Sequence, residues 1–330
     1  MNLKPQMKIA VTGATGHVGT NLCRILIDQG HQVKVLIHSD AIGLEGLPLE
    51  FIRGDITNES DLENLCSGCD VVYHLAAFIS IHKKEPKCEK INTESCHNLI
   101  RAARSQGVKR IIHFSSIHAF NQEPLETELN ETRELALGST SSYDSSKAHG
   151  QRLMMEASSA GPEVVVLNPT AIIGPNDFKP SLLGNAVIRF YRGENPSLIP
   201  GGYNWVDVRD ICQAAVNAID NGVPGECYLL GGSWQSLKTM AGTVEKLGGH
   251  KAPWLSLPMW VAWLGAGVLN MHARITKRVP LYTTMSLEVL KHGHKNISSQ
   301  KAKTVLGFNP RPFEETISDT IQWFKENGYL

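Results

Sequence analysis

Residues 11–19 read VTGATGHVG, and this stretch decides the fold. A β-branched run precedes the glycines and apolar residues at helical spacing follow them, which predicts a strand, a tight turn and a helix. Gly13 permits the tight turn, Gly16 lets backbone N–H groups approach a pyrophosphate, and Gly19 lets the helix lie close to the sheet. The helix N-terminus adds a favourable dipole for phosphate. The stretch therefore predicts a dinucleotide-binding turn.

The three glycines are spaced GxxGxxG, one residue longer than the GxGxxG pattern of many dinucleotide-binding proteins. A glycine-rich turn that serves packing alone is the alternative. The strand before the turn and the helix after it favour the binding interpretation. The residues expected to contact the cofactor here are Gly13, Ala14, Thr15, Gly16, His17, Val18 and Gly19.

Short apolar runs recur along the first half of the chain. They lie at 32–37, 49–55, 70–77, 110–116 and 163–169. Near-continuous apolar strands that alternate with helices are typical of a parallel sheet covered on both faces. The sequence therefore predicts an α/β fold, with a Rossmann-type doubly wound parallel sheet and a smaller C-terminal substrate lobe.

The boundary between these two lobes is expected to be discontinuous. We expect the dinucleotide-binding domain at 1–168, rejoined by about 203–232, and the substrate domain in the rest of 169–330, mainly 169–202 and 233–330. The most apolar segment, 252–271, carries early prolines and closely flanking charges that argue against a stable membrane span. A buried helix, a lid over a pocket and a transient membrane contact all stay open for it.

The composition excludes several classes of protein. The 330 residues carry 32 Lys and Arg against 32 Asp and Glu, so no positive excess exists to attract nucleic acid. Seven scattered cysteines lack the density of a disulfide scaffold and are expected as reduced thiols. The first residues show no basic stretch followed by a long apolar one, which favours a cytoplasmic protein.

The ends of the second and third strands bear on the choice between NAD and NADP. Proteins that prefer NAD commonly carry an acid at the end of the second strand, where it binds the ribose hydroxyls. Here that position holds Ile37, His38 and Ser39, so no carboxylate repels a 2′-phosphate and no arginine grips one. NADP is therefore favoured, with NAD as the alternative. Asp55, next to Ile56, is either an acceptor for an adenine amino group or a turn residue.

Two further motifs carry acid–base chemistry. Tyr143 and Lys147 stand four residues apart at the start of an amphipathic helix, so both side chains project from one face. A nearby ammonium and a cationic nicotinamide would favour the phenolate, which predicts a lowered pKa for Tyr143. Ser115 and Ser116 end a strand at the edge where open α/β sheets place ligands, so a hydroxyl there donates to a substrate carbonyl or caps a turn.

The order and spacing of the motifs resemble those of the extended short-chain dehydrogenase/reductases, also called the NAD-dependent epimerase/dehydratase superfamily. The motifs that match are VTGATGHVG, GDIT, HLAA, INTES, FSSIHAF, YDSSK and LNPTAIIGP. The later segments WVDVRDI and KRVPLYT are similar to the dihydroflavonol-reductase-like branch, which lies near the 3β-hydroxysteroid dehydrogenases. The resemblance covers essentially the whole chain.

The resemblance implies that Ser116, Tyr143 and Lys147 form the catalytic set. Ser116 is preferred to Ser115 because the family's active hydroxyl lies four residues before an aromatic residue, here Phe120. Lys147 would bind the nicotinamide ribose and lower the pKa of Tyr143. The family often forms homodimers through the helix that carries this tyrosine. Further cofactor contacts are implied for Leu75, Ala76, Ala77, Asn92, Asn168, Pro169 and Ile172.

Departures from the family pattern narrow the range of expected substrates. Sugar-nucleotide dehydratases place an Asp-Glu pair after the active hydroxyl, where this chain has Ile117 and His118, so dehydration is disfavoured. Many nucleotide-sugar epimerases have an arginine where this chain has Tyr203, and tyrosine cannot clamp a diphosphate bidentately. These departures favour a less charged, more hydrophobic substrate. Its cavity is expected to include Phe78, His118, Phe120, Tyr191 and Tyr203.

No metal site is expected from the sequence. Cys66 and Cys69 form a CxxC pair, but no second pair lies at zinc-site spacing, and the histidines form no HExxH pattern.

The motifs together predict a reductase. In this hypothesis NADPH delivers hydride to a ketone or aldehyde of a fairly hydrophobic small molecule, Tyr143 protonates the oxygen and Ser116 stabilises the developing charge. The reverse reaction oxidises an alcohol. An epimerase with tightly bound NAD would use the same residues, and a non-catalytic protein that senses the cofactor is the second alternative.

Overall fold

A seven-stranded sheet forms the main layer of the computed structural model, which describes residues 5–38, 40–80, 83–264 and 284–330. The strand order is β3-β2-β1-β4-β5-β6-β9, and every neighbouring pair is parallel. The chain winds outward from β1 to β3 and then in the other direction from β4 to β9, so the order reverses between β1 and β4. Open α/β sheets bind ligands at such a switch point. The prediction of a doubly wound parallel sheet is confirmed.

The expected strands are present, and three of them end earlier than expected. The bounds are β1 Lys8–Thr12, β2 Gln32–Ile37, β3 Leu49–Arg53, β4 Val71–His74, β5 Arg110–Phe114, β6 Glu163–Pro169 and β9 Cys227–Leu230. The residues that follow β3, β4 and β5 leave the ladder at the carboxyl edge of the sheet. This edge therefore gathers the GD, LAA and SS segments of the sequence motifs.

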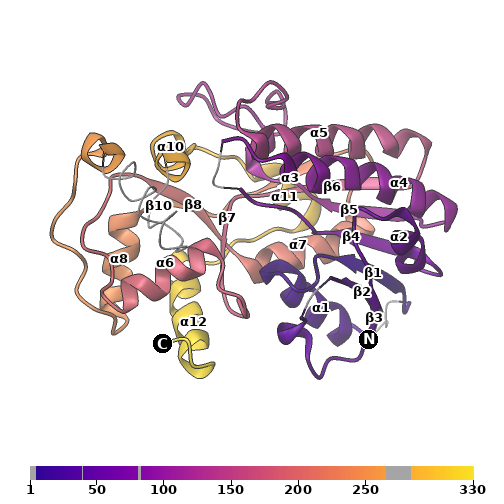
Figure 1. Ribbon diagram of the computed structural model, residues 1–330, viewed down its shortest axis with the longest axis horizontal. Helices are drawn as coiled ribbons and strands as arrows, with labels where there is room; N and C mark the ends of the chain where they lie inside the picture. Colours follow the sequence, from indigo (N-terminus) through magenta and orange to yellow (C-terminus); the bar gives the residue numbers. More distant parts are fainter. Residues whose placement is uncertain (1–4, 39, 81–82, 265–283) are drawn as a thin grey trace.

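Helices cover both faces of the sheet (Figure 1). On one face lie α2 (Glu59–Cys66), α4 (Ser95–Ser105) and α5 (Ser142–Ala157). On the other lie α1 (His17–Asp28), α7 (Val208–Asn221) and α11 (Gln300–Leu306). Apolar side chains of each helix set pack with the strand residues that face them into a separate buried cluster. The short elements are η1 Ile42–Leu44, α3 Pro86–Glu89, the π-helical turn η2 Lys90–Glu94, η3 Ile117–Ala119 and η4 Ser158–Ala160.

A smaller lobe contains a second sheet with the order β10-β8-β7. Its strands are β7 (Ala171–Ile173), β8 (Gly202–Asp207) and β10 (Ser233–Ser236). The lobe also contains α6 (Leu182–Tyr191), α8 (Leu237–Lys246), α10 (Thr284–His292) and α12 (Phe313–Glu326), whose apolar residues form a third buried cluster. Because β8 lies in this sheet while α7 and β9 belong to the main layer, the chain passes between the lobes more than once. The domain bounds stay a prediction.

An ion-pair network joins the start of α7 to the segment before α12. Asp207 caps α7 and accepts two hydrogen bonds from the Arg209 guanidinium, at 2.9 and 2.7 Å. Arg311 donates to one carboxylate oxygen of Asp210 at 3.0 and 2.8 Å. Arg209 also pairs with Asp319 on α12, 2.7 Å away. The network therefore ties the last helix to the β8–α7 junction.

The apolar segment 252–271 lies only partly within the described residues. Trp254 and Trp260 are 92% and 67% exposed, whereas Ala262 is buried. Residues 265–271 lie outside the described residues. Among the helices that the structure describes, none is both long and apolar enough to cross a membrane.

All seven cysteines are free and buried. Burial raises the pKa of Cys23, Cys66 and Cys96 to about 12 and that of Cys227 to about 11. These thiols are therefore protonated at neutral pH.

Candidate active site

Close backbone contacts shape the glycine turn between β1 and α1. Gly13 has a φ of +70°, and a Cβ there would lie 2.6 Å from the backbone nitrogen of Ala76. A Cβ on Gly19 would lie 2.3 Å from the carbonyl oxygen of Gly13. A Cβ on Gly16 would meet only that same oxygen, at 3.4 Å. The turn is thus tightly packed at Gly13 and Gly19 and open beside Gly16, where a phosphate group could approach.

The first turn of α1 is available to an anion. Gly16 is the N-cap, and within the described part of the chain no side chain caps the helix and no acidic residue lies in its first turn. Free backbone N–H groups and the positive end of the helix dipole form a favourable site for a pyrophosphate. The residues present therefore fit NAD(P), which would be held by Gly13, Ala14, Thr15, Gly16, His17, Val18 and Gly19.

A loop from the middle of the chain lies against the start of α1. His17 Nε2 is 3.0 Å from the carbonyl oxygen of Pro175, and Asn21 Nδ2 donates to the same oxygen at 3.0 Å. Asn176 Nδ2 donates to Asn21 Oδ1 at 2.9 Å. The segment after β7 is thereby fixed beside the N-terminus of α1.

The ends of β2 and β3 present the residues that bear on the nucleotide ribose. His38 is exposed after β2, and Lys179 forms an ion pair with Asp40, 2.6 Å away. Asp55 Oδ1 accepts hydrogen bonds from the backbone nitrogen and the hydroxyl of Thr57, both at 2.8 Å. Asp55 therefore has the turn role that the sequence allowed, and its contact with adenine stays a prediction. The contacts of the neighbouring Ile56 with cofactor also stay a prediction.

The extension of β4 packs on the glycine turn. Thr12 accepts from the backbone of this extension twice, through its carbonyl oxygen from Leu75 N and through its hydroxyl from Ala76 N, both at 3.3 Å. Leu75 and Ala76 are half-buried and Ala77 is exposed. Their backbone lies at the switch point between β1 and β4, where the family resemblance expects the cofactor.

The hydroxyl of Ser116 and the phenol of Tyr143 meet at the carboxyl edge of β5. The Ser116 hydroxyl lies close enough to the Tyr143 phenol to lower the pKa of that phenol. The Ser116 hydroxyl also accepts from the backbone N–H of His118 at 3.2 Å. Ser115 is buried, and its hydroxyl has no partner among the described residues. The choice of Ser116 over Ser115 as the candidate catalytic hydroxyl stays a prediction, and the meeting of Ser116 with Tyr143 favours it.

The pKa of Tyr143 differs from the sequence expectation. Burial raises it to about 12, and the nearby Ser116 hydroxyl lowers it only in part. Asp144 and Cys88 raise it further, and Lys147 is not among the groups that act on it. The expectation of a lowered pKa is therefore wrong for the protein's own groups, because burial outweighs them. The sequence pattern gave the spacing of the two residues but not the depth at which they are buried.

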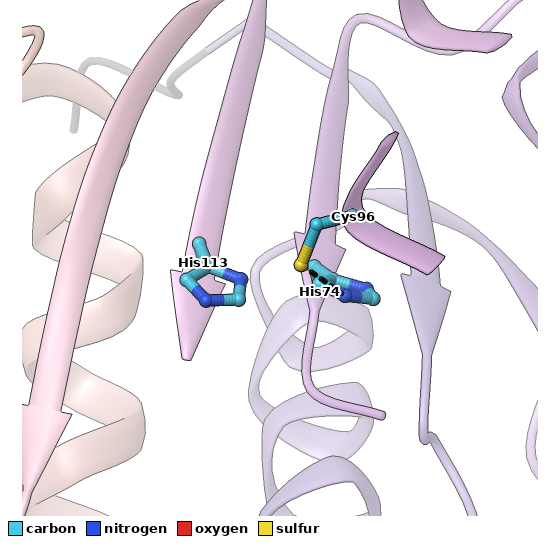
Figure 2. Close-up of side chains that lie close together, drawn as sticks. All are labelled: His74, Cys96 and His113. Carbon is cyan, nitrogen blue, oxygen red and sulfur yellow. Dashed lines mark hydrogen bonds between the residues drawn. The ribbon is translucent and has the colours of Figure 1, made fainter. Parts of the chain in front are cut away.

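Lys147 is buried on the first turns of α5, and its ammonium donates to the carbonyl oxygen of Phe114 at 2.7 Å. Burial lowers its pKa to about 8. The Lys147 charge acts on three buried side chains, namely His74 on β4, His113 on β5 and Cys96 on α4. Figure 2 shows these three side chains close together. Burial lowers the pKa of His74 to about 3 and that of His113 well below its usual range. The groups near Lys147 are thus neutral at pH 7.

The same three side chains bring nitrogen and sulfur atoms within 4.8 Å of one another. Neither the CxxC pair nor any histidine pattern indicated this cluster, because its members come from three separate elements. The two imidazole rings stack, with centroids 5.2 Å apart and planes 22° from parallel. A metal ion must lie near the plane of each ligating ring, and stacked rings do not share such a point. The arrangement therefore favours packing over metal binding.

Replacement of Lys147 by methionine is expected to change how stability depends on pH. The wild-type lysine has a pKa of about 8 when folded and about 10.4 when unfolded. Between these values the unfolded chain binds more protons, so the lysine's contribution to stability rises with pH. Relative to Lys147→Met, the wild type should gain about 2 kcal/mol of unfolding free energy between pH 7 and pH 10. Urea unfolding at both pH values measures this, and a constant difference would contradict it.

Two asparagines that the resemblance implies as cofactor contacts are buried and form hydrogen bonds to neighbouring residues of the site. Asn92 accepts from the backbone N–H of Phe78 at 2.8 Å and donates to the carbonyl oxygen of the same residue at 3.0 Å. Asn168 donates to the carbonyl oxygen of Ser116 at 2.9 Å and to Gln151 Oε1 at 2.6 Å. Both therefore fix the backbone of neighbouring site residues. Their cofactor contacts, and those of Pro169 on β6 and Ile172 on β7, stay predictions.

A cavity of about 750 Å³ opens beside Asp144 at the start of α5, and Ser116 and Tyr143 are not among the residues that line it. His118 and Phe120 line it, together with Asp144, which follows Tyr143 in the chain. The His118 and Tyr143 rings lie edge to face, with centroids 5.9 Å apart. Sequence reasoning missed Asp144, although its place next to Tyr143 on the first turn of α5 was a usable signal.

The other three residues expected around the substrate are not among those that line this cavity. Tyr191 and Tyr203 pack against the buried cluster of the smaller lobe, and Tyr203 contacts Trp205 edge to face at 5.3 Å. Phe78 is half-buried beside Lys87, whose ammonium lies 5.8 Å from its ring centroid. Their roles in substrate binding stay predictions.

The fold and the site define a dinucleotide-dependent α/β enzyme, and comparison with known proteins places it in a family. Residues 9–231 match the model of the NAD dependent epimerase/dehydratase family. The chain belongs to this family, the extended short-chain dehydrogenase/reductases, as the sequence motifs indicate. A nicotinamide cofactor follows for the family as a whole.

Individual relatives cover nearly the whole chain. "Sterol demethylase protein B" of Methylococcus capsulatus is 31% identical over 98% of this chain and 100% of its own length. A Synechocystis protein, named provisionally as a dihydroflavonol 4-reductase, is 29% identical over 97% of this chain and 95% of its own. The crystal structure of gox2253 superposes with a TM-score of 0.84 at 29% identity, covering 99% and 100% of the two chains. The similarity to the dihydroflavonol-reductase-like branch is confirmed.

Proposed function

We propose that this protein is a reductase that uses NAD(P)H to convert a ketone or aldehyde of a fairly hydrophobic small molecule into an alcohol. The meeting of Ser116 and Tyr143 at the carboxyl edge of β5, with Lys147 one turn further along α5, carries the proposal. When bound, the reduced nicotinamide supplies the hydride. The reverse reaction oxidises the alcohol.

Tyr143 acts as the proton donor in this proposal. Its pKa of about 12 keeps the phenol protonated at neutral pH, which is the form that reduction requires. The phenolic O–H bond breaks as the proton passes to the substrate oxygen. The Ser116 hydroxyl accepts from the backbone of His118, so its own proton is free to donate to the same oxygen and stabilise negative charge there.

Lys147 binds the nicotinamide ribose in this proposal. Among the described residues its ammonium donates to one acceptor, the carbonyl oxygen of Phe114, and an ammonium can donate three hydrogen bonds. Two donors are therefore left for ribose hydroxyls.

NADP is the preferred cofactor in the proposal. The ion pair with Lys179 neutralises Asp40, the acid nearest the end of β2, so its carboxylate repels a 2′-phosphate less. His38 is exposed at the same edge and can donate to a phosphate oxygen. A hydrophobic substrate is supported by the names of the two relatives.

Calorimetry with the purified protein tests the proposal. We expect reversible binding of NADPH at least tenfold tighter than binding of NADH. We then expect oxidation of NADPH with members of a panel of hydrophobic ketones and aldehydes. Denatured protein should release no nucleotide. Retained NAD together with the interconversion of nucleotide sugars, without net cofactor turnover, would overturn the reductase in favour of an epimerase.

A further inference from the structure

The loop between β7 and α6, residues 174–181, reaches from the smaller lobe to two points on the cofactor lobe. Near its start, the carbonyl oxygen of Pro175 lies 3.0 Å from His17 Nε2 on the first turn of α1. Near its end, the ammonium of Lys179 lies 2.6 Å from Asp40 Oδ1, just after β2. The start of α1 is the expected site of the pyrophosphate, and the end of β2 is the expected site of the adenosine ribose. The loop therefore spans the adenosine half of the cofactor site.

Phe178 fixes this loop between the two lobes. On the side of the cofactor lobe, the Arg24 guanidinium of α1 lies 5.7 Å from the centroid of the Phe178 ring. On the side of the smaller lobe, Trp323 of α12 contacts the same ring edge to face, with centroids 4.9 Å apart. The Tyr329 hydroxyl also donates to the Phe178 carbonyl oxygen at 2.6 Å. The backbone next to Lys179 is thereby held in place at the ribose edge.

The ammonium of Lys179 can accept a further anionic partner. It donates to the backbone carbonyl oxygen of Asp40 at 3.3 Å and pairs with the carboxylate of the same residue. An ammonium has three donors, so one is left for a ligand. The Lys179 side chain is 44% exposed, which leaves it open to the solvent side. A phosphate monoester carries a charge of about −1.5 to −2 at neutral pH and therefore attracts an ammonium more strongly than a single carboxylate does.

Two other cationic side chains lie at the same edge of the sheet. His38 is exposed after β2, and Arg53 is exposed at the end of β3, in register with Ile37. Lys179 differs from both because it comes from the smaller lobe, on a loop that contacts of both lobes hold. It therefore loses less conformational freedom when it binds a phosphate there.

We propose that Lys179 binds the 2′-phosphate of NADPH and sets the preference for NADPH over NADH. This inference rests on the proposed function, because it names the residue behind the cofactor choice made there. The ammonium contacts the phosphate while it stays beside Asp40. NADH has a hydroxyl at this position, so it leaves the Lys179–Asp40 pair as it is and does not need the lysine. A side chain of the smaller lobe thereby takes part in the choice of cofactor.

Calorimetric titration of the full chain with NADPH and with NADH, in the absence of any ketone, tests this inference. In Lys179→Met the dissociation constant of NADPH should rise about tenfold, because a hydrogen bond between two charged groups is lost. The dissociation constant of NADH should stay unchanged, which also shows that the variant is folded. Lys179→Arg should keep most of the preference for NADPH. Lys303→Met, which changes an exposed lysine on α11, is the matched control and should bind both cofactors as the wild type does.

The result is separate from the test of the reductase, because binding alone is measured. A preference for NADPH that Lys179→Met abolishes, in a protein that reduces no ketone or aldehyde, would contradict the reductase and support the phosphate site. An unchanged NADPH affinity in Lys179→Met, equal losses for NADPH and NADH, or no preference in the wild type would overturn the phosphate site. Loss of the preference in Arg53→Met but not in Lys179→Met would also overturn it, because the phosphate would then belong to Arg53.

Discussion

Tyr143→Phe is expected to lower kcat for ketone reduction by a factor of about 10²–10⁴. The phenol is the only group that the proposal uses as proton donor, and phenylalanine keeps the ring while removing the acidic proton. The edge-to-face contact with His118 does not need the hydroxyl, so the ring should stay in place. Steady-state NADPH oxidation with a ketone that the wild type reduces measures the effect.

The fold of this variant must be shown to be intact. Thermal unfolding and NADPH binding should both remain close to wild type, since the cofactor's main contacts are expected at the glycine turn. A rate within tenfold of wild type would contradict the assignment of Tyr143 and move attention to His118 as an alternative donor. Ser116→Ala should reduce the rate less, because it removes a hydrogen bond to the oxygen but leaves the acid.

Gly16→Ala is expected to weaken NADPH binding, whereas Gly19→Ala is expected to lower the free energy of unfolding. Alanine at position 16 meets only the Gly13 carbonyl oxygen, at 3.4 Å, so unfolding free energy should change by less than about 1 kcal/mol. Its methyl group would occupy the open space beside the turn, where the phosphate approaches. NADPH should therefore bind at least tenfold more weakly.

Alanine at position 19 meets the Gly13 carbonyl oxygen at 2.3 Å, far inside van der Waals contact. The helix and the turn must move apart, which should cost about 1–3 kcal/mol of unfolding free energy. Chemical denaturation and calorimetric NADPH titration of both variants check the pair. Loss of stability in Gly16→Ala with unchanged NADPH binding would show that the turn serves packing alone.

Local sequence patterns were sufficient to predict the main layer of the fold. Strands rich in Val, Ile and Leu are typical of a buried parallel sheet, and the runs at 32–37 and 163–169 have this composition without help from distant residues. The glycine turn was equally clear, because its backbone conformation depends on residues within one short stretch. The runs at 49–55, 70–77 and 110–116 were predicted too long, since their last residues leave the ladder at the sheet edge.

Features that depend on distant residues could not be predicted. Asp144 stands beside His118 although 26 positions separate them, and only the packing of α5 on η3 brings them together. The pKa of Tyr143 was predicted in the wrong direction because a helical spacing reveals which residues share a face but not how deeply that face is buried. The stacked His74 and His113 are aligned by the register of β4 and β5, which no single-strand pattern encodes.

In the candidate active site, too, features within one element could be predicted and features that depend on distant residues could not. The residues of the glycine turn and the Tyr143–Lys147 spacing were readable, because each lies within one element. Tyr191 and Tyr203 illustrate the opposite case, since their aromatic character suited a substrate cavity and a packed core equally well. The structure places both against the core of the smaller lobe.

Because every cysteine is buried, the reactivity of the thiols measures how far this chain has unfolded. A thiol reagent reacts with the thiolate, and each of the seven side chains is shielded in the native state while being protonated at neutral pH. Alkylation by such a reagent would then proceed only through molecules that have opened, and the mass added per molecule would count how many thiols each opening uncovers. Regions that open separately, such as the helix carrying Cys96 and the strand carrying Cys227, would be told apart by peptide mapping without any engineered label.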